Sequence, residues 1–224
     1  MTATACAGGP GAAQPTDIMD VETTVGPARA HRWAAGPARR GRIVLGHGAG
    51  GRSWSADLLA MTVLAADGWD VVLVEQPWRV AGRKVAGPPA QLDAAWTAVV
   101  SQLAREQSAG DRGGALVLGG RSAGARVACR TAAGLRADAV LALAFPLHPP
   151  GRADRTRAAE LAGVASLPVL LVQGRRDPFG RPEEFEAAGL AAGSCRLAAV
   201  TGGHGFGPDL AEVVDQVRAW LAQV

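Results

Sequence analysis

The sequence predicts an α/β fold with a mainly parallel central sheet and helices on both faces. Short apolar runs, typical of strands buried on both faces, alternate with segments whose apolar residues recur at the three- and four-residue spacing of amphipathic helices. Glycine and proline clusters separate these segments. With 224 residues and 48% hydrophobic composition, the chain can bury the core of one domain, which we expect over residues 21–224.

The first half of the chain begins with two expected strands, 21–25 and 28–35, joined by a Gly-Pro turn. The continuous apolar run at 42–48 predicts a strand buried on both faces. Residues 55–68 predict a helix that ends at a glycine, and residues 70–77 predict the next strand.

The second half repeats this alternation. A helix is expected over 88–107, with one apolar face made by Leu92, Ala95, Trp96, Val99, Val100 and Leu103. Further strands are expected at 115–120, 139–145, 168–174 and 195–200, and further helices at 122–134, 183–190 and 208–224. Two Pro/Gly-rich stretches, 76–89 and 146–155, follow predicted strands; they are either walls of a ligand pocket or simple connections.

Composition excludes several classes of function. The 23 basic residues include a single lysine, and they are scattered among acidic residues without interleaved aromatics, so we expect no nucleic-acid partner. Cys6, Cys129 and Cys195 have no disulfide or zinc spacing, which fits a reducing cytoplasm. Residues 1–20 are small and lack the basic and apolar regions of a signal peptide, so a flexible tail is expected. No apolar run reaches the roughly 18 residues of a membrane span, so we expect no membrane partner.

A glycine-rich loop after the strand at 42–48 has two interpretations. Gly46, Gly48 and Gly51 form G-x-G-x-x-G, and Glu75 ends the next strand, as in dinucleotide-binding units. The same loop contains H-G-A-G-G, a sequence that can supply a backbone amide to the oxyanion hole of a serine hydrolase.

A second motif, G-x-S-x-G, places Ser122 between an apolar strand and a helix. A tight turn there holds the serine in a strained backbone conformation, and the flanking Gly120 and Gly124 keep the neighbouring chain from colliding with it. The hydroxyl would then stand above the sheet, beside the amide of Ala123 at the start of the helix.

Two further residues follow in the order that this strand-turn-helix arrangement requires: nucleophile, acid, then histidine. Asp177 comes directly after the strand at 168–174, and His204 comes after the last strand. Carboxyl ends of parallel strands lie on one rim, so we expect Ser122, Asp177 and His204 to form a catalytic triad. The glycine loop then supplies the second oxyanion amide, from Ala49 or Gly50. The dinucleotide interpretation leaves the serine motif unexplained, and its loop does not follow the first strand.

These motifs carry a family resemblance. With "GHGAGG", "GGRSAGARVA", "FPLHPPG" and "QGRRDPFG", the chain from about residue 22 onward resembles the α/β-hydrolases. It is most similar to the small dienelactone-hydrolase-like group without a cap domain, which includes a testis-expressed hydrolase-like protein and a subunit of the non-specific-lethal acetyltransferase complex. The resemblance implies the same triad. Members of the group mostly lack a firm substrate, and at least one works within a protein complex. Dienelactone hydrolases proper use a cysteine nucleophile, where this chain has Ser122.

We therefore expect a serine hydrolase that acts on a small ester, lactone or related acyl substrate through an acyl-enzyme, without cofactor or metal. Its substrate pocket is expected to include Trp78, Arg79, Arg121 and His148, with Arg121 either binding an acidic substrate group or serving a structural role. The alternative is a non-catalytic interaction module that retains the hydrolase fold. A protein partner is possible, but no residue pattern indicates one.

Overall fold

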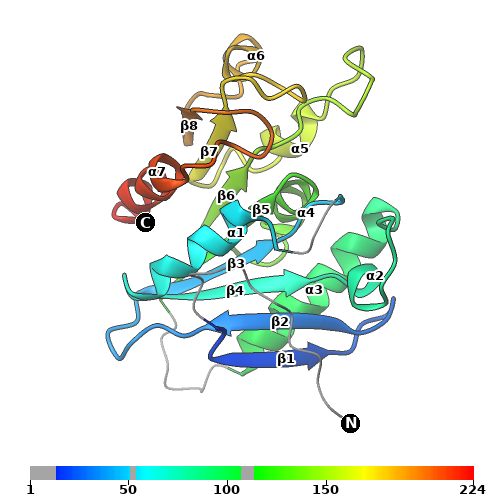
Figure 1. Cartoon of the computed structure of the whole chain (residues 1–224), viewed down its shortest axis with the longest axis vertical. Coiled ribbons are helices and arrows are strands. Elements are labelled where there is room, and N and C mark those ends of the chain that lie inside the picture. The colour runs from blue at the N-terminus through cyan, green and yellow to red at the C-terminus, as the bar shows by residue number, and fades with distance from the viewer. Residues whose placement is uncertain (1–13, 51–53, 107–113) are drawn as a thin grey trace.

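An eight-stranded sheet forms the centre of the structure (Figure 1). The computed structural model describes residues 14–50, 54–106 and 114–224. Strands β1 to β8 span Asp17–Val21, Ala28–Trp33, Gly41–Gly46, Trp69–Glu75, Ala115–Arg121, Ala139–Leu143, Val169–Gly174 and Cys195–Val200. Their spatial order is β1-β2-β4-β3-β5-β6-β7-β8; β3 to β8 are parallel, whereas β2 is antiparallel to both β1 and β4. The mainly parallel sheet predicted from the sequence is confirmed.

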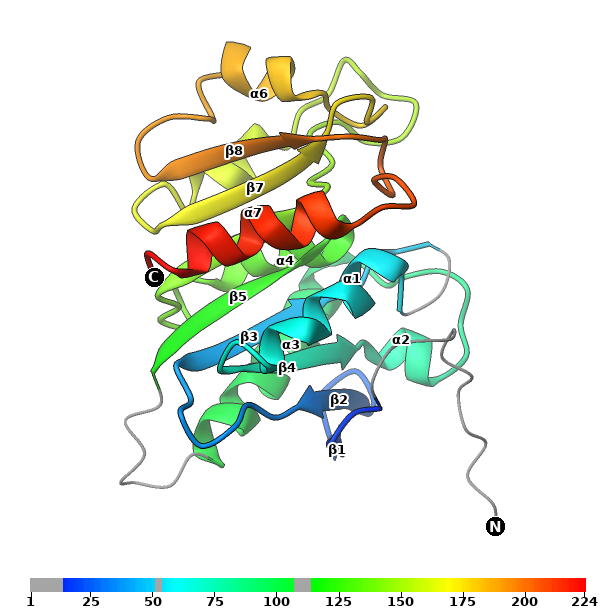
Figure 2. The same ribbon diagram turned by 60° about the vertical axis from the view of Figure 1, so that its left-hand side comes forward.

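Helices cover both faces of this sheet (Figure 2). On one face lie α1 (Ala56–Ala60), the 3-10 helix η1 (Met61–Ala65) and α7 (Ala211–Leu221). Buried residues of α3 (Pro89–Arg105), α4 (Ala123–Thr131), α5 (Ala158–Ala162) and α6 (Pro182–Ala187) pack on the other. The short helix α2 (Pro77–Val80) follows β4.

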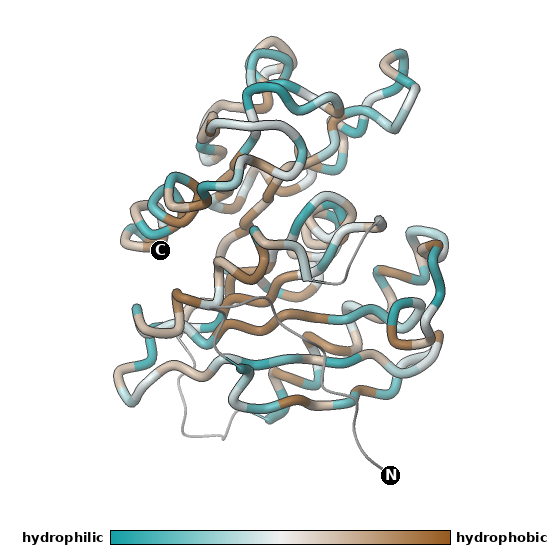
Figure 3. The backbone as a smooth tube through the Cα atoms, viewed as in Figure 1, coloured by the Kyte–Doolittle hydropathy of each residue, from teal (hydrophilic) through white to brown (hydrophobic). Residues whose placement is uncertain are grey.

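The apolar runs are continuous because the inner strands are buried on both sides. In β4, Val71 and Leu73 pack into one core cluster, and Val72 and Val74 pack into the other. Figure 3 shows this distribution, with the most hydrophobic segments along the inner strands and hydrophilic colours along the outer loops.

The strand order predicts a ligand-binding position at the carboxyl ends of β3 and β5. The chain passes from β3 to β4 on one side and then to β5 on the other side of β3. The connections that leave β3 and β5 therefore diverge, and ligands bind at such positions beyond the carboxyl ends of the strands.

The prediction of the first strand was wrong by several residues. β1 covers 17–21, not 21–25, so residues 17–20 of the expected tail belong to the sheet; residues 1–13 of that tail lie outside the described part. Thr23 is the physical reason, because its hydroxyl donates to the carbonyl of Gly26 and accepts from the amide of Val25, which closes a turn. Gly26 has a φ of 108°, which ends any extended strand there.

Other elements differ in detail. The helix expected over 55–68 is divided into α1 and η1. The Pro/Gly-rich stretch 76–89 contains the short helix α2, and the short helix α5 follows the stretch 146–155; neither helix was predicted. No cap domain is inserted between the strands within the described ranges. None of the helices described by the structure is both long and apolar enough to span a membrane.

Candidate active site

Ser122 stands in a strained turn between β5 and α4. Its φ of 54° lies in the left-handed region that non-glycine residues rarely adopt. Its amide donates to the carbonyl of Leu143 over 2.9 Å, which fixes the turn against β6. A Cβ at Gly120 would come within 2.4 Å of the Gly46 carbonyl oxygen, and one at Gly124 within 2.1 Å. The two glycines therefore let the start of α4 approach β3, and Ser122 adopts the strained backbone conformation of the turn.

Ser122, His204 and Asp177 form a continuous hydrogen-bonded series. The Ser122 Oγ lies 3.0 Å from His204 Nε2, and His204 Nδ1 lies 2.8 Å from Asp177 Oδ2. A carboxylate only accepts, so Nδ1 carries the proton and Nε2 is free to accept from the serine hydroxyl. The structure thus brings together the three residues that the sequence predicts.

Asp177 is held by more than the histidine. It is 1% exposed, and its Oδ1 accepts from the amide of Phe179 over 2.9 Å. Gln173, at the end of β7, donates from Nε2 to Asp177 Oδ2 over 2.9 Å and to the Gly180 carbonyl over 2.8 Å. These donors satisfy a buried carboxylate and fix its orientation. Sequence reasoning missed Gln173, although a polar residue inside the apolar run "VLLVQG" was a signal for it.

The glycine loop after β3 packs directly against this series. A Cβ at Gly48 would lie 3.6 Å from the Ser122 Cβ. The buried His47 fixes the loop, because its Nε2 accepts from the Gln76 amide over 3.1 Å, which leaves Nδ1 to donate to the Gly48 carbonyl over 2.8 Å. Burial lowers the pKa of His47, so the ring is held in its neutral form. Sequence reasoning had not assigned His47 this role.

Two of the three residues expected to form the oxyanion hole, Ala49 and Ala123, lie at the same place. Ala123 is the first residue of α4, so its amide has no partner inside the helix. Ala49 and Ala123 line one recess. Ala49 and Gly50 are both exposed, and Gly50 does not line this recess. The third glycine of the dinucleotide motif, Gly51, lies outside the described residues, and Glu75 forms a contact with His31 of β2 at 3.7 Å.

Arg121, expected in the substrate pocket, is engaged by the protein itself. Its Nε donates to Asp57 Oδ2 over 2.8 Å, and its Nη2 donates to the His204 carbonyl over 3.0 Å. Asp57 is 2% exposed, and its other oxygen accepts from the Leu58 amide and the Ser55 hydroxyl. Arg121 therefore connects the serine turn, the start of α1 and the histidine loop.

The other three expected pocket residues are divided between two places. Trp78 lines the recess beside Ala123, and the guanidinium of Arg79 stacks over the Trp78 ring at 4.2 Å. His148 lies instead toward α6, where Nδ1 contacts the Arg155 carbonyl at 2.7 Å and Nε2 contacts Glu184 at 3.0 Å. Neither of these two contacts involves Ser122 or His204.

Comparisons with known proteins show the family and the fold of this chain. A family model described as an alpha/beta hydrolase domain matches residues 39–222. No curated protein matched the chain.

Solved structures resemble the fold at low sequence identity. The α/β serine hydrolase XC6422 of Xanthomonas campestris, described as having no lid, is 17% identical, with 93% of this chain and 95% of that chain covered and a TM-score of 0.71. Est1E of Butyrivibrio proteoclasticus is 15% identical, with 92% and 98% covered and a TM-score of 0.72. A dienelactone hydrolase of Anabaena variabilis is 16% identical, with 94% and 99% covered and a TM-score of 0.69.

Proposed function

Because this chain belongs to the family of α/β-hydrolase domains, we propose that it is a serine hydrolase acting on small esters, lactones or related acyl compounds. The observation that carries the proposal is the series Ser122–His204–Asp177, with both hydrogen bonds at 3.0 Å or less. The similar structures include proteins named as a serine hydrolase, Est1E and a dienelactone hydrolase, which is consistent with acyl transfer.

In the proposed reaction, the Ser122 Oγ attacks the carbonyl carbon while His204 Nε2 takes the hydroxyl proton. The same Nε2–H then protonates the leaving alcohol, which leaves an acyl group on Ser122. Water, deprotonated by His204, then attacks the carbonyl carbon of the acyl-enzyme. The bond between that carbon and the Ser122 Oγ breaks, His204 returns its proton to the Oγ, and the carboxylic acid leaves. Asp177 remains ionised, orients the imidazole and stabilises its charged form during each step. Neither a cofactor nor a metal takes part.

The negative charge that develops on the carbonyl oxygen needs amide donors. The amide of Ala123 serves as one donor, because it sits at the free start of α4 directly after the nucleophile. Ala49 is favoured over Gly50 as the second donor, because Ala49 lines the same recess as Ala123. Each such donor contributes about 3 kcal/mol to stabilising the transition state.

Labelling with a fluorophosphonate, followed by intact-mass measurement, tests this function. The wild type should gain one adduct and hydrolyse short phenyl esters, and Ser122→Ala should lose both properties while its Tm stays within a few degrees. Ser194→Ala is the matched control, since Ser194 lies at the amino-terminal end of β8, away from the rim that carries His204.

The alternative, a non-catalytic interaction module with this fold, predicts the opposite result. If the folded wild type gains no adduct and hydrolyses no ester, the series Ser122–His204–Asp177 is not an activated triad and the proposed function is wrong.

A further inference from the structure

The loop between β8 and α7 carries His204 on a tight turn (Figure 2). Gly203 and Phe206 pair as an isolated antiparallel bridge, and the Phe206 amide donates to the Gly203 carbonyl over 2.9 Å. Only His204 and Gly205 lie between the two bridge residues. The position of the imidazole is therefore tied to Phe206, because so short a turn leaves the chain little freedom.

Phe206 has an unusual backbone conformation for an aromatic residue. Its φ is 59°, in the left-handed region that only glycine adopts at little cost. Neither of the adjacent glycines, Gly205 and Gly207, has a positive φ. Within 203–207 the left-handed position is thus occupied by a phenylalanine, although glycines stand on both sides of it. Such strain persists only where the surroundings hold the residue in place.

The core on one face of the sheet holds Phe206. The residue is 8% exposed and belongs to the same buried cluster as Val200 of β8 and Val213 of α7. Burial of an aromatic ring is a large favourable contribution, which offsets the strain of the backbone. A Cβ at Gly202 would lie 2.3 Å from the carbonyl carbon of Phe206, so the end of the turn also packs against its start. Phe206 therefore anchors the turn.

This anchor adds to two contacts on the other side of the loop. The Arg176 amide donates to the Gly202 carbonyl over 2.9 Å, and Arg121 Nη2 donates to the His204 carbonyl over 3.0 Å. These contacts hold the loop up to His204, and Phe206 holds it beyond that residue. A base that must contact a nucleophile and an acid at hydrogen-bond distance needs both ends of its loop fixed.

We propose that Phe206 is a positioning residue of the proposed hydrolase: its buried ring holds the turn 203–206 in a strained conformation and so keeps His204 Nε2 within reach of the Ser122 Oγ. Phe206 acts through His204 and does not bind the substrate. The inference rests on the proposed function and adds a residue to its machinery.

Phe206→Gly tests this role, because it removes the ring and also relieves the strain, which favours a folded variant. With phenyl acetate, kcat should fall by about tenfold or more while KM changes by less than about twofold. Phe206→Leu keeps an apolar side chain in the core, so its kcat should lie between those of the wild type and Phe206→Gly. If Phe206→Gly does not fold, Phe206→Leu decides, and a wild-type kcat in that variant overturns the inference.

Val217→Ala is the matched control for stability. It removes buried apolar volume from the same core cluster, on α7, and should lower Tm. Its kcat should change by less than about twofold, because the turn 203–206 keeps its anchor.

Proton NMR of the His204 ring supplies a measurement that does not depend on turnover. The Nδ1 proton, bonded to Asp177, should give a far-downfield resonance that His204→Ala lacks. Well below the Tm of each protein, this resonance should persist in the wild type and in Val217→Ala, and should broaden or disappear in Phe206→Gly, where the imidazole is no longer held.

The outcomes separate the two proposals. A Phe206→Gly variant that keeps kcat, or that raises KM instead, overturns the positioning role and leaves the serine hydrolase standing. Equal losses of kcat in Phe206→Gly and Val217→Ala overturn it as well, because such losses would come from stability alone. A wild type that turns over no ester and gains no fluorophosphonate adduct overturns both.

Discussion

Arg121 lies at the junction of three segments that the proposed reaction needs in fixed positions. It precedes the nucleophile in the chain, it donates to the carbonyl of His204, and it pairs with the buried Asp57. A Cβ at Gly48 would come within 3.1 Å of its Nη1, so it also borders the glycine loop. We interpret Arg121 as a positioning residue rather than a group that binds substrate.

Arg121→Gln should lower kcat by about tenfold to a hundredfold with little change in KM, since a displaced histidine loop weakens proton transfer more than binding. The variant also leaves Asp57 buried without its partner, which lowers Tm. Adding Asp57→Asn should restore part of the Tm but not kcat. Arg218→Gln, which breaks an exposed pair with Asp67, is the control for charge loss. Recovery of kcat together with Tm would show that Arg121 is only structural.

The two cysteines that the structure describes, Cys129 and Cys195, are buried and should be unreactive. Burial raises the pKa of the Cys129 thiol to about 12 and that of the Cys195 thiol to about 11. At pH 8 both remain almost entirely thiols, which react poorly with alkylating reagents. We expect iodoacetamide to modify neither residue in the folded protein and both in urea, as peptide mass mapping would show. Rapid labelling of Cys129 in the native state would contradict this assignment.

At the scale of elements, long periodic segments were predictable and short ones were not. The strand at 168–174 and the helix α3 carry their signals locally, in apolar runs and helical spacing. The helices α2 and α5 have four and five residues, too few to show a period, and neighbouring segments stabilise them.

The same distinction applies to the candidate site. Ser122, Asp177 and His204 each follow a strand, so local sequence and topology predict where they lie. The partners of Arg121 do not follow from local sequence, because Asp57 is 64 residues away and the His204 carbonyl is 83 residues away. Contacts of that kind depend on how whole elements pack together, and local sequence patterns do not reveal that packing.

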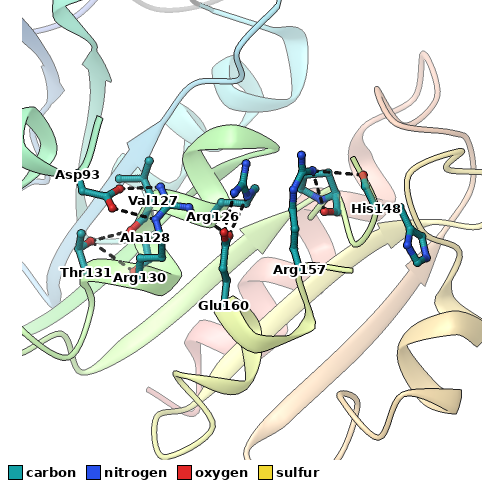
Figure 4. Close-up of polar contacts among 10 residues, drawn as sticks. Asp93, Arg126, Val127, Ala128, Arg130, Thr131, His148, Arg157 and Glu160 are labelled. Carbon is teal, nitrogen blue, oxygen red and sulfur yellow. Dashed lines mark hydrogen bonds and ion pairs between the residues drawn. The ribbon is translucent and has the colours of Figure 1, made fainter. Parts of the chain in front are cut away.

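A charged network connects α4 to its two neighbours (Figure 4). Glu160 of α5 accepts from Arg126 over 2.6 and 2.8 Å and from Arg130 over 3.1 Å, and Arg130 continues to Asp93 of α3. Arg157, beside this network, donates to the His148 carbonyl over 3.2 Å. Because α4 carries the serine turn at its start, the network fixes the helix that orients the nucleophile.

The contribution of this network to the free energy of unfolding should depend on pH. Burial alone would raise the pKa of Glu160, but the hydrogen bonds and charges of Arg126 and Arg130 outweigh burial and lower it below the ordinary 4.5. A lowered pKa in the folded state gives stability that is present above pH 4.5 and is lost as the pH falls through the folded value. Glu160→Gln should therefore lower the free energy of unfolding by about 1–2 kcal/mol at pH 7, and by less as the pH falls below 4.5.

Urea unfolding of both proteins between pH 7 and pH 3 measures this dependence. Asp154→Asn is the control, because its pair with Arg152 is exposed and should leave stability nearly unchanged. A difference between wild type and Glu160→Gln that stays constant over this range would mean that ionisation of Glu160 does not contribute.

At the scale of the whole molecule, one part of the sheet carries the candidate site and the β1–β2 end covers the core. The candidate site uses β5, β7 and β8, whereas β1 and β2 form the antiparallel end that continues β4. β1 pairs with β2 over five residues, its Val21 is 5% exposed, and Met19 packs against the same core cluster as α3. The hairpin thus closes the core at the edge of the sheet farthest from His204.

Deleting residues 1–21 should consequently lower the free energy of unfolding while Ser122 stays reactive. Relative to a chain that lacks only residues 1–13, we expect a loss of about 3 kcal/mol in the free energy of unfolding, from the apolar burial of Val21 and Met19 and from the lost strand pairing. β2 would become an uncovered edge, so the deletion should also increase self-association on size-exclusion chromatography. The monomeric fraction should still gain one fluorophosphonate adduct at Ser122, because the serine turn, α4 and the β7–β8 loops keep their own contacts. Loss of that adduct from a folded monomer would show that the hairpin and the candidate site are coupled across the sheet, and equal stability of the two deletions would show that β1 is dispensable.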